Sequence, residues 1–311
     1  MQYNLLGKTD LRVSRLSYGA SPLGSVFGPV REEDGIATVH AALDCGINLI
    51  DVSPFYGLTK AETLLGKALK TVKRDLYYLS TKVGRYGNDA RDFDFSANRV
   101  IASVDESLGR LGLEYVDLIQ CHDIEFGSLD QVIHETIPAL LKLRDTGKVR
   151  YIGITGLPLK IFREVLAQSH VDVILSYCRY SLNDSSLLQL IPLLKQKGVG
   201  IISASPLSMG LLSDQGPPTW HPAPADVQAA CAKAVKHCQK RGGNISKLAL
   251  QYSLANADIA TTLVGTAKEQ NIRMNAQWAD EPLDQQLLAE VLEILKPIQG
   301  KSWPSGRKEN N

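Results

Sequence analysis

Asp51 and Tyr56 place an acid and a phenol five residues apart, directly after a short apolar run at residues 46–50. The run predicts a buried strand that ends on the carboxylate of Asp51. Pro54 and Gly57 then stop regular structure, so we expect Tyr56 in a tight loop. Parallel α/β folds carry their chemistry where strands end and loops begin. By itself the pair also fits an ordinary strand-to-helix turn, in which Asp51 caps the helix and Tyr56 packs.

Two further polar side chains end the next two predicted strands. Lys82 closes the run at residues 76–81, and His122 follows the run at residues 116–121. Alone, the first fits a surface lysine and the second a hydrogen-bonded core histidine. The carboxyl ends of neighbouring parallel strands meet at one mouth, however. We therefore expect all four side chains to lie in one layer.

Such a group of side chains suits proton transfer to or from a carbonyl or hydroxyl oxygen. A phenol titrates near pH ~10, and an ammonium group close to its oxygen favours the phenolate. Lys82 is therefore expected to lower the pKa of Tyr56, while Asp51 holds the lysine charged and oriented. His122 would direct a substrate oxygen. The chain has no His-Glu-x-x-His segment, no carboxylate–histidine cluster at ligand spacing and no Ser/His/Asp arrangement, so no metal site or triad is predicted.

Alternating strands and helices must position these side chains. Residues 3–6 and 11–13 predict a hairpin with its turn at residues 7–10. The expected strands are then 16–19, 46–51, 76–82, 116–121, 151–154, 171–175, 199–203 and 260–264. The expected helices are 32–45, 60–69, 96–108, 129–144, 160–167, 186–197, 226–240, 246–254, 270–279 and 283–295.

This order of elements predicts an α/β fold: one closed (β/α)8 TIM barrel over residues 1–311, with an N-terminal β-hairpin and extra C-terminal helices. A barrel covers its sheet on both faces, which explains the nearly continuous apolar strands. The alternative is a doubly wound sheet, which normally carries Gly-x-Gly-x-x-Gly after its first strand. No such run occurs in the chain, and we therefore favour the barrel.

Composition limits the partners and the compartment. The net charge of +1 gives no reason to expect a nucleic acid or an anionic membrane as partner. Five cysteines without a Cys-x-x-Cys pair predict free thiols in a reducing compartment. We find no secretory leader and no long apolar run, so we expect a cytoplasmic protein without a membrane span or an obligate protein partner. The polar residues 306–311 are expected to fray.

Asp51, Tyr56, Lys82 and His122, in this order on strands two to four, resemble the catalytic tetrad of the aldo-keto reductases. The resemblance covers nearly the whole chain and includes the segments at residues 112–118 and 147–153. It implies a nicotinamide dinucleotide bound in extended form over the barrel mouth, with Tyr56 as general acid and base. The segments 122–126 and 203–210 resemble, more narrowly, plant members of the family that oxidise L-galactose at C1. That resemblance implies an NAD-dependent sugar dehydrogenase of ascorbate biosynthesis.

The resemblance also assigns cofactor-binding positions, strand end by strand end. They are Gly19, Ala20, Ser21 and Asp51 near the nicotinamide, Thr155 and Tyr177 at its carboxamide, Ser205, Leu207 and Gly210 along the pyrophosphate, and Gly265, Thr266, Lys268, Asn271 and Asn275 at the adenosine end. Three positions depart from the family pattern: Gly156 replaces a usual asparagine, Tyr177 a frequent glutamine, and Ala204 an aromatic residue that stacks on the nicotinamide. Tyr177 is a candidate for the missing aromatic surface.

The adenosine end indicates NAD as the cofactor. NADP-preferring members present a lysine and an arginine to the 2′-phosphate, at positions that align with Gly265 and Asn271. A phosphate dianion needs such cationic partners. Lys268 and Arg273 could substitute in part.

A small sugar is the implied partner, held by Tyr56 and His122, with Asp123, Glu125 and the region 85–91 as further candidates. Two other functions stay open: an NADP(H)-dependent general aldehyde or ketone reductase, and a nicotinamide-binding regulatory subunit that senses redox state. A barrel isomerase or hydrolase of sugar phosphates would need a glycine-rich phosphate site after strands seven and eight, which this chain lacks. For Cys121 we favour a packed thiol over a redox-sensitive one.

Overall fold

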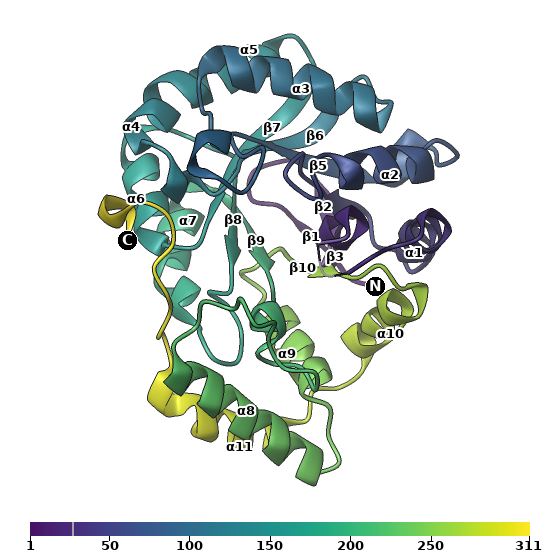
Figure 1. The fold of residues 1–311 in the computed structure, drawn as a ribbon, viewed down its shortest axis with the longest axis vertical. Helices are drawn as coiled ribbons and strands as arrows, with labels where there is room; N and C mark the ends of the chain where they lie inside the picture. The colour runs from purple at the N-terminus through teal and green to yellow at the C-terminus, as the bar shows by residue number, and fades with distance from the viewer. Residues whose placement is uncertain (27) are drawn as a thin grey trace.

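Eight parallel strands close into a barrel in the computed structural model, which describes residues 1–26 and 28–311 (Figure 1). Their order around the barrel is β10-β3-β4-β5-β6-β7-β8-β9. The strands are β3 (Leu16–Gly19), β4 (Leu49–Asp51), β5 (Tyr78–Val83), β6 (Val116–Cys121), β7 (Val149–Gly156), β8 (Val173–Tyr177), β9 (Gly200–Ala204) and β10 (Thr261–Gly265). The closed order confirms the predicted barrel and excludes a doubly wound sheet, which would have two edge strands.

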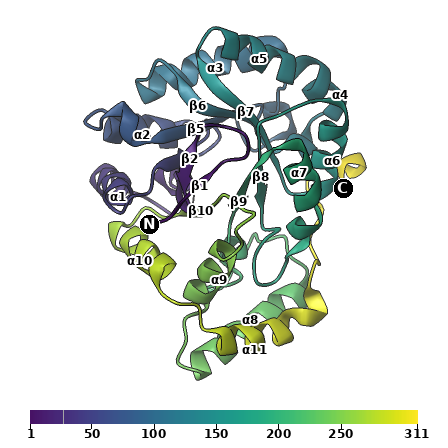
Figure 2. The ribbon, with the colours of Figure 1, turned by 180° about the vertical axis from the view of Figure 1, so that it is seen from behind.

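Helices surround the barrel on its outer face, as the two opposite views show (Figures 1 and 2). They are α1 (Glu32–Asp44), α2 (Lys60–Leu69), α3 (Ala97–Leu111), α4 (Leu129–Gln131), α5 (Ile137–Asp145), α6 (Leu159–Gln168), α7 (Ile191–Lys197), α8 (Ala225–Lys240), α9 (Ile245–Leu254), α10 (Glu269–Asp280) and α11 (Gln285–Leu295). Short 3-10 turns are η1 (Ser21–Gly24), η2 (Arg74–Leu76), η3 (Ala90–Asp92), η4 (Ile124–Phe126), η6 (Ser186–Gln189), η7 (Ser208–Gly210), η8 (Lys296–Ile298) and η9 (Lys308–Asn310). Within the described part of the chain, no helix has the length and apolar character needed to cross a bilayer.

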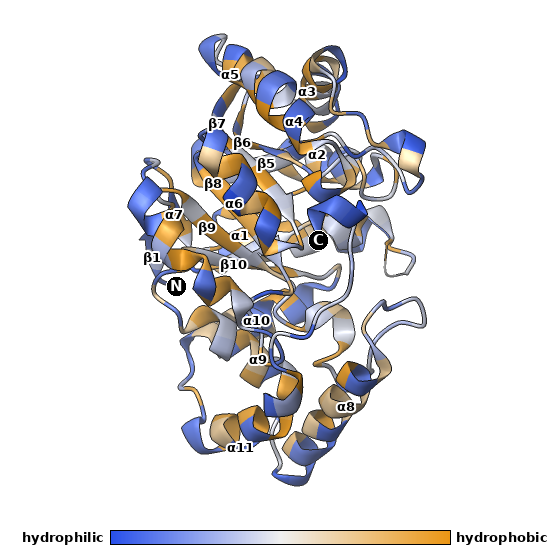
Figure 3. Ribbon diagram, turned by 90° about the vertical axis from the view of Figure 1, so that its left-hand side faces the viewer, coloured by the Kyte–Doolittle hydropathy of each residue, from blue (hydrophilic) through white to orange (hydrophobic). Residues whose placement is uncertain are grey.

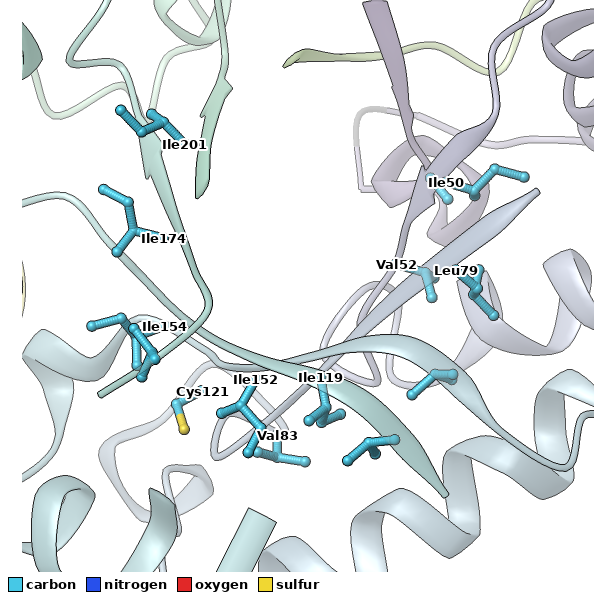
Figure 4. Close-up of a cluster of buried hydrophobic side chains, with 14 of the residues drawn as sticks. Ile50, Val52, Leu79, Val83, Ile119, Cys121, Ile152, Ile154, Ile174 and Ile201 are labelled. Carbon is cyan, nitrogen blue, oxygen red and sulfur yellow. The ribbon is translucent and has the colours of Figure 1, made fainter. Parts of the chain in front are cut away.

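Side-chain alternation along the strands decides what faces the interior. Successive strand residues point to opposite faces. Figure 4 shows the outward set, in which Ile119 and Cys121 of β6 join Leu79 and Val83 of β5 in the layer beneath the helices. The residues between them therefore point inward, toward the barrel axis.

The amino end of the barrel is closed by the predicted hairpin. Strands β1 (Tyr3–Leu5) and β2 (Arg12–Ser14) pair antiparallel. Leu6, Leu11 and Val13 of the hairpin are fully buried and form one cluster with inward-facing apolar residues such as Leu118 and Val173. A packed lower barrel leaves the carboxyl ends of the strands as the place for polar side chains.

Two predicted helices change helix type close to a proline. The predicted helix 129–144 is α4, a π-helical turn η5 (Val132–Thr136) and α5, with Pro138 in the first turn of α5. The predicted helix 186–197 is η6 followed by α7, which also has proline in its first turn. Proline has no N–H and its ring clashes with the preceding turn, so a proline inside a helical pattern forces a change of helix type.

The expectation that residues 306–311 fray is wrong. Helices α8 and α11 lie against each other over a second apolar cluster (Figure 3). From α11 the C-terminal segment runs back along the barrel to end beside α6 (Figures 1 and 2). Asn310 is buried and its Nδ2 donates to the carbonyl oxygens of Glu125 and Gly127, at 2.8 and 3.1 Å. Side-chain bonds to a distant turn, which no local pattern reveals, hold this polar segment.

Candidate active site

The four expected side chains lie together at the carboxyl ends of β4, β5 and β6. Lys82 Nζ donates to Asp51 Oδ1, to the Val52 carbonyl oxygen at 2.9 Å, and to Tyr56 Oη at 3.4 Å. The ring of His122 packs edge-on against Tyr56, with 5.7 Å between ring centroids. Lys82 and Asp51 are buried, and the phenol is half-buried. The spatial grouping inferred from the strand ends is present.

Two residues that the sequence reasoning missed hold the Asp51 carboxylate. Its Oδ2 accepts from Ser80 Oγ at 2.8 Å and from Gln120 Nε2 at 3.1 Å. Ser80 and Gln120 precede Lys82 and His122 by two positions, so each shares the inward face of its strand. The sequence contains a sign of both residues, because each is a polar residue two positions before a polar strand end and therefore shares its face.

The loop that carries Tyr56 is fixed by a close backbone approach. Gly57 has φ +63°, and a Cβ there would lie 2.1 Å from the carbonyl oxygen of Gly24. Only glycine tolerates both conditions at low cost. The Tyr56 N–H donates to the Ser53 carbonyl oxygen at 3.1 Å, and the Tyr56 carbonyl oxygen accepts from Ala61 N at 3.2 Å. The backbone of the loop that carries Tyr56 is thus held between η1 and the start of α2.

Lys82 lowers the pKa of Tyr56 as expected, but a larger opposing effect outweighs it. Burial raises this pKa, and Lys82 opposes the rise without overcoming it, while Asp51 and Asp123 add to it. For Lys82, burial lowers the pKa, but the attraction of Asp51 and Tyr56 outweighs burial and leaves it raised. The pair is therefore a charged ammonium beside a neutral phenol.

His122 is neutral and held by a serine hydroxyl. Its Nδ1 lies 3.0 Å from Ser53 Oγ, and its Nε2 lies 3.7 Å from Asp123 Oδ2. Burial lowers the pKa of His122 to about 3; Asp123 opposes this, and Lys82 and Arg85 reinforce it. A neutral imidazole can serve as a hydrogen-bond donor or acceptor without carrying charge into the site.

Asp123, a candidate substrate contact, is held in place by protein partners. Its Oδ2 accepts from Arg85 Nη1 at 2.5 Å, its Oδ1 accepts from Thr155 Oγ1 at 3.3 Å, and its N–H donates to Thr155 Oγ1 at 2.9 Å. The guanidinium of Arg85 lies 3.6 Å above the ring of Phe55. Thr155, expected at the carboxamide, thus also serves to orient the turn that follows His122.

Glu125 is likewise enclosed by protein. Its Oε1 accepts from Leu157 N at 3.1 Å, Tyr177 Oη at 3.4 Å and Ser305 Oγ at 2.9 Å, the last from the C-terminal segment. Burial first, and then Asp123, raise the pKa of Glu125 to about 8. A Cβ on Gly156 would lie 2.6 Å from Glu125 Oε2 and 2.3 Å from Ile161 Cδ1. Glycine in place of the family's usual asparagine at position 156 therefore has a steric reason, because Glu125 occupies the space that a side chain at this position would need.

Replacing Glu125 by glutamine is expected to remove a pH dependence of stability. The carboxyl group has a folded-state pKa of about 8, above its ordinary value of 4.5, so the folded protein binds more protons between these pH values. Stability then falls as pH rises through this window, by at most about 1.4 kcal/mol per pH unit. In urea unfolding from pH 5 to 8.5, the free energy of unfolding of Glu125→Gln should increase relative to that of the wild type as pH rises. A constant difference across that range would contradict the raised pKa.

The cofactor positions inferred from the resemblance lie on the remaining strand ends. Thr155, Tyr177 and Ser205 follow one another at the ends of β7, β8 and β9, and the barrel order continues through β10 to β3. These ends form an arc around the mouth that complements the arc of β4, β5 and β6. Tyr177 is the register partner of Ala204, so its ring stands beside the position that lacks an aromatic residue.

The residues of this arc fit an elongated dinucleotide. At the rim, Gly19 and Gly265 are register partners without side chains, which leaves the backbone open to close approach. Leu207 is the N-cap residue of the turn η7, and Gly210, with φ +103°, is the last residue of that turn. Ala20 and Ser21 begin the segment that follows β3.

At the outer end of the arc, Thr266 is buried, and its hydroxyl accepts from Lys268 N at 3.1 Å and Asn271 Nδ2 at 3.3 Å. Lys268 is the N-cap of α10, and Asn275 lies one turn after Asn271. The N-terminus of this helix attracts negative charge. Arg273, however, is already paired with Glu269 at 2.9 Å and Asp44 at 3.2 Å.

Cys121 packs in the wall of the barrel. Its side chain points into the apolar layer beside Ile152 and Val83 (Figure 4), and it is fully buried. Burial raises the pKa of the thiol to about 12, and a protonated, inaccessible thiol is a poor nucleophile. The structure thus gives Cys121 the packing role that the sequence favoured.

Comparison with known proteins identifies the class of protein to which this barrel belongs. The model of the aldo/keto reductase family matches residues 15–296, and the chain belongs to this family. It is therefore an oxidoreductase of a family that uses nicotinamide cofactors. L-galactose dehydrogenase of Arabidopsis thaliana is 55% identical over 319 residues, which cover 100% of this chain and 99% of that protein.

More distant relatives share the architecture. D-threo-aldose 1-dehydrogenase of a Pseudomonas species is 29% identical over 310 residues, covering 91% of this chain and 94% of that protein. Among solved structures, an aldo-keto reductase from Bacillus halodurans in its holo form has a TM-score of 0.79 and 28% identity. The match covers 100% of this chain and 99% of that one.

Proposed function

We propose that this protein oxidises the C1 hydroxyl of L-galactose to L-galactono-1,4-lactone with NAD, in ascorbate biosynthesis. The single observation that carries the proposal is the 55% identity, over the whole chain, to a plant L-galactose dehydrogenase. The arrangement of Tyr56, Lys82 and His122 at the barrel mouth is consistent with it, because removal of a hydroxyl proton requires a positioned base.

Each side chain of the site then has a role in handling the proton. Tyr56 acts as the phenolate, which the ammonium of Lys82, 3.4 Å from Oη, stabilises; it accepts the proton of the C1 hydroxyl and becomes the neutral phenol. Asp51 keeps Lys82 charged and oriented. His122 contacts the sugar oxygen and fixes its direction. A nicotinamide dinucleotide, when bound, would be held along the arc from Thr155 to Asn275 and would supply the acceptor for the hydride that leaves C1.

NAD is the proposed form of the cofactor because the adenosine end offers little to a 2′-phosphate. Gly265 has no side chain, and Asn271 turns inward to Thr266. Arg273, considered above as a partial substitute, is neutralised by two carboxylates. Lys268 alone remains as an exposed cation among the positions named for this end. A cytoplasmic location is part of the proposal, since the five cysteines are free.

A panel of aldoses, monitored by NADH absorbance, tests the function. We expect L-galactose to give the highest kcat/KM with NAD. Turnover of small aldehydes with NADPH and none of the sugars would replace the proposal with a general reductase. Dinucleotide binding without turnover of any sugar or aldehyde would favour a redox-sensing subunit.

Asn271→Arg is expected to raise kcat/KM with NADP by about tenfold to a hundredfold, because a charge-assisted hydrogen bond contributes roughly 1.5–3 kcal/mol. Asn271 is half-buried beside Thr266, at the proposed adenosine end of the arc. An arginine at this position is long enough to extend from the rim toward a 2′-phosphate. Steady-state kinetics with both cofactors measures the ratio. Gln277→Arg, on the exposed side of α10, is the control and should leave the ratio unchanged. A wild-type preference for NADP would contradict the assignment of NAD.

A further inference from the structure

Ser53 lies between Asp51 and Tyr56, and the proposed proton transfer gives it no role. The residue is fully buried. Its hydroxyl oxygen accepts from the N–H of Phe55 at 3.1 Å and lies 3.0 Å from His122 Nδ1. Ser53 thus contacts Nδ1 of His122, whereas Asp123 Oδ2 lies near the other ring nitrogen, Nε2.

Counting protons decides the direction of this contact. A hydroxyl has one proton to donate, and the N–H of Phe55 already occupies one of the acceptor positions on Ser53 Oγ. In the part of the chain that the structure describes, His122 Nδ1 is the one acceptor recorded for the Ser53 proton. If Nδ1 carried the proton, the buried hydroxyl would accept twice and donate to nothing. Such an unmade hydrogen bond costs roughly 1–3 kcal/mol.

The other nitrogen supports the same assignment. Asp123 Oδ2 lies 3.7 Å from His122 Nε2, and its negative charge favours a proton on that nitrogen. Asp123 is itself fixed by Arg85 and Thr155, so the carboxylate is held in place. Ser53 and Asp123 therefore act on opposite nitrogens of the ring, and both favour one tautomer.

We propose that Ser53 is a positioning residue that fixes His122 as the Nε2–H tautomer, so that His122 presents a hydrogen-bond donor to the substrate oxygen on which Tyr56 acts. This inference rests on the proposed function for its catalytic meaning. His122 then keeps its proton throughout: the hydroxyl proton passes from the substrate to Tyr56, while the Nε2–H group only donates a hydrogen bond. The opposite tautomer would turn a lone pair toward this oxygen, which could accept the hydroxyl proton in competition with Tyr56 and would repel the carbonyl oxygen of the product.

The tautomer can be read directly from long-range ¹H–¹⁵N spectra of the full-length protein labelled at histidine nitrogen. The wild-type spectrum should show His122 with Nε2 protonated and Nδ1 bare. Ser53→Ala should populate the Nδ1–H form and lower kcat/KM by about tenfold, the equivalent of ~1.4 kcal/mol. Ser53→Thr, which keeps the hydroxyl, should retain the wild-type tautomer. Ser253→Ala removes a buried hydroxyl bonded to the Tyr180 carbonyl oxygen and is the matched control.

A wild-type His122 protonated at Nδ1 would overturn the inference, and this measurement does not depend on whether any variant folds. An Nε2–H form that persists fully in Ser53→Ala, with unchanged kinetics, would also overturn it. The spectrum is independent of the substrate. If no sugar is turned over, the proposed function fails, while the tautomer still decides the role of Ser53.

Discussion

Tyr56→Phe is expected to lower kcat for sugar oxidation by about three orders of magnitude, within the range that positioned acid–base groups contribute. The substitution removes one oxygen atom, and that oxygen lies 3.4 Å from Lys82 Nζ. The aromatic ring that packs against His122 and Phe55 is kept. Most of the positions proposed to bind the dinucleotide lie on other strand ends, and Asp51 is unchanged, so dinucleotide binding should stay near the wild-type level.

Kinetics and dinucleotide titration separate the two effects. The pH profile adds a signature, since burial raises the Tyr56 pKa and oxidation needs the phenolate. Wild-type kcat/KM should therefore increase with pH through the neutral and mildly alkaline range, and the variant should lose this slope. Tyr3→Phe removes an exposed hydroxyl that bonds the Gly46 carbonyl oxygen and serves as control. Full activity in Tyr56→Phe would remove the phenol from the mechanism.

Side-chain alternation is why the arrangement of the four side chains could be predicted from the sequence. Apolar residues at alternate positions of β5 and β6 face the helices, so Lys82 and His122 must face the axis. Parallel strands then bring their ends to one mouth without any knowledge of distances. The same argument would have found Ser80 and Gln120, which hold Asp51.

Contacts between distant segments could not be predicted in this way. Ser305 bonds Glu125 across 180 residues of sequence, and Asn310 bonds two carbonyl oxygens of the same turn. The short polar segment has neither periodicity nor capping signals beyond its own turn. Asp123 and Glu125 were candidates for substrate contacts, and nothing in the sequence indicated that Arg85, β7, β8 and the C-terminal segment supply partners to them. Burial depends on the whole fold, and spacing along one strand does not reveal it.

Lys82→Met is the second change with a large expected effect, this time on stability as well as activity. Lys82 is 1% exposed and Asp51 3% exposed, so the pair is screened from water. Removing the ammonium leaves a buried carboxylate whose remaining side-chain partners, among residues 1–26 and 28–311, are Ser80 and Gln120. Breaking a buried pair in this way costs about 3–5 kcal/mol. Urea unfolding should show this loss, and turnover should fall because Tyr56 loses the charge that stabilises its phenolate.

Combining Lys82→Met with Asp51→Asn distinguishes the two consequences. The double variant has no unpaired buried charge, so much of the lost stability should return. Its activity should stay low, because the ammonium beside Tyr56 is still missing. Lys67→Met breaks the exposed pair with Glu32 and should cost no more than about 1 kcal/mol. If the double variant were as unstable as Lys82→Met, the cost would come from lost packing of the lysine side chain. If it regained activity, the phenol would need no neighbouring cation, and the proposed proton transfer would have to be assigned to another group.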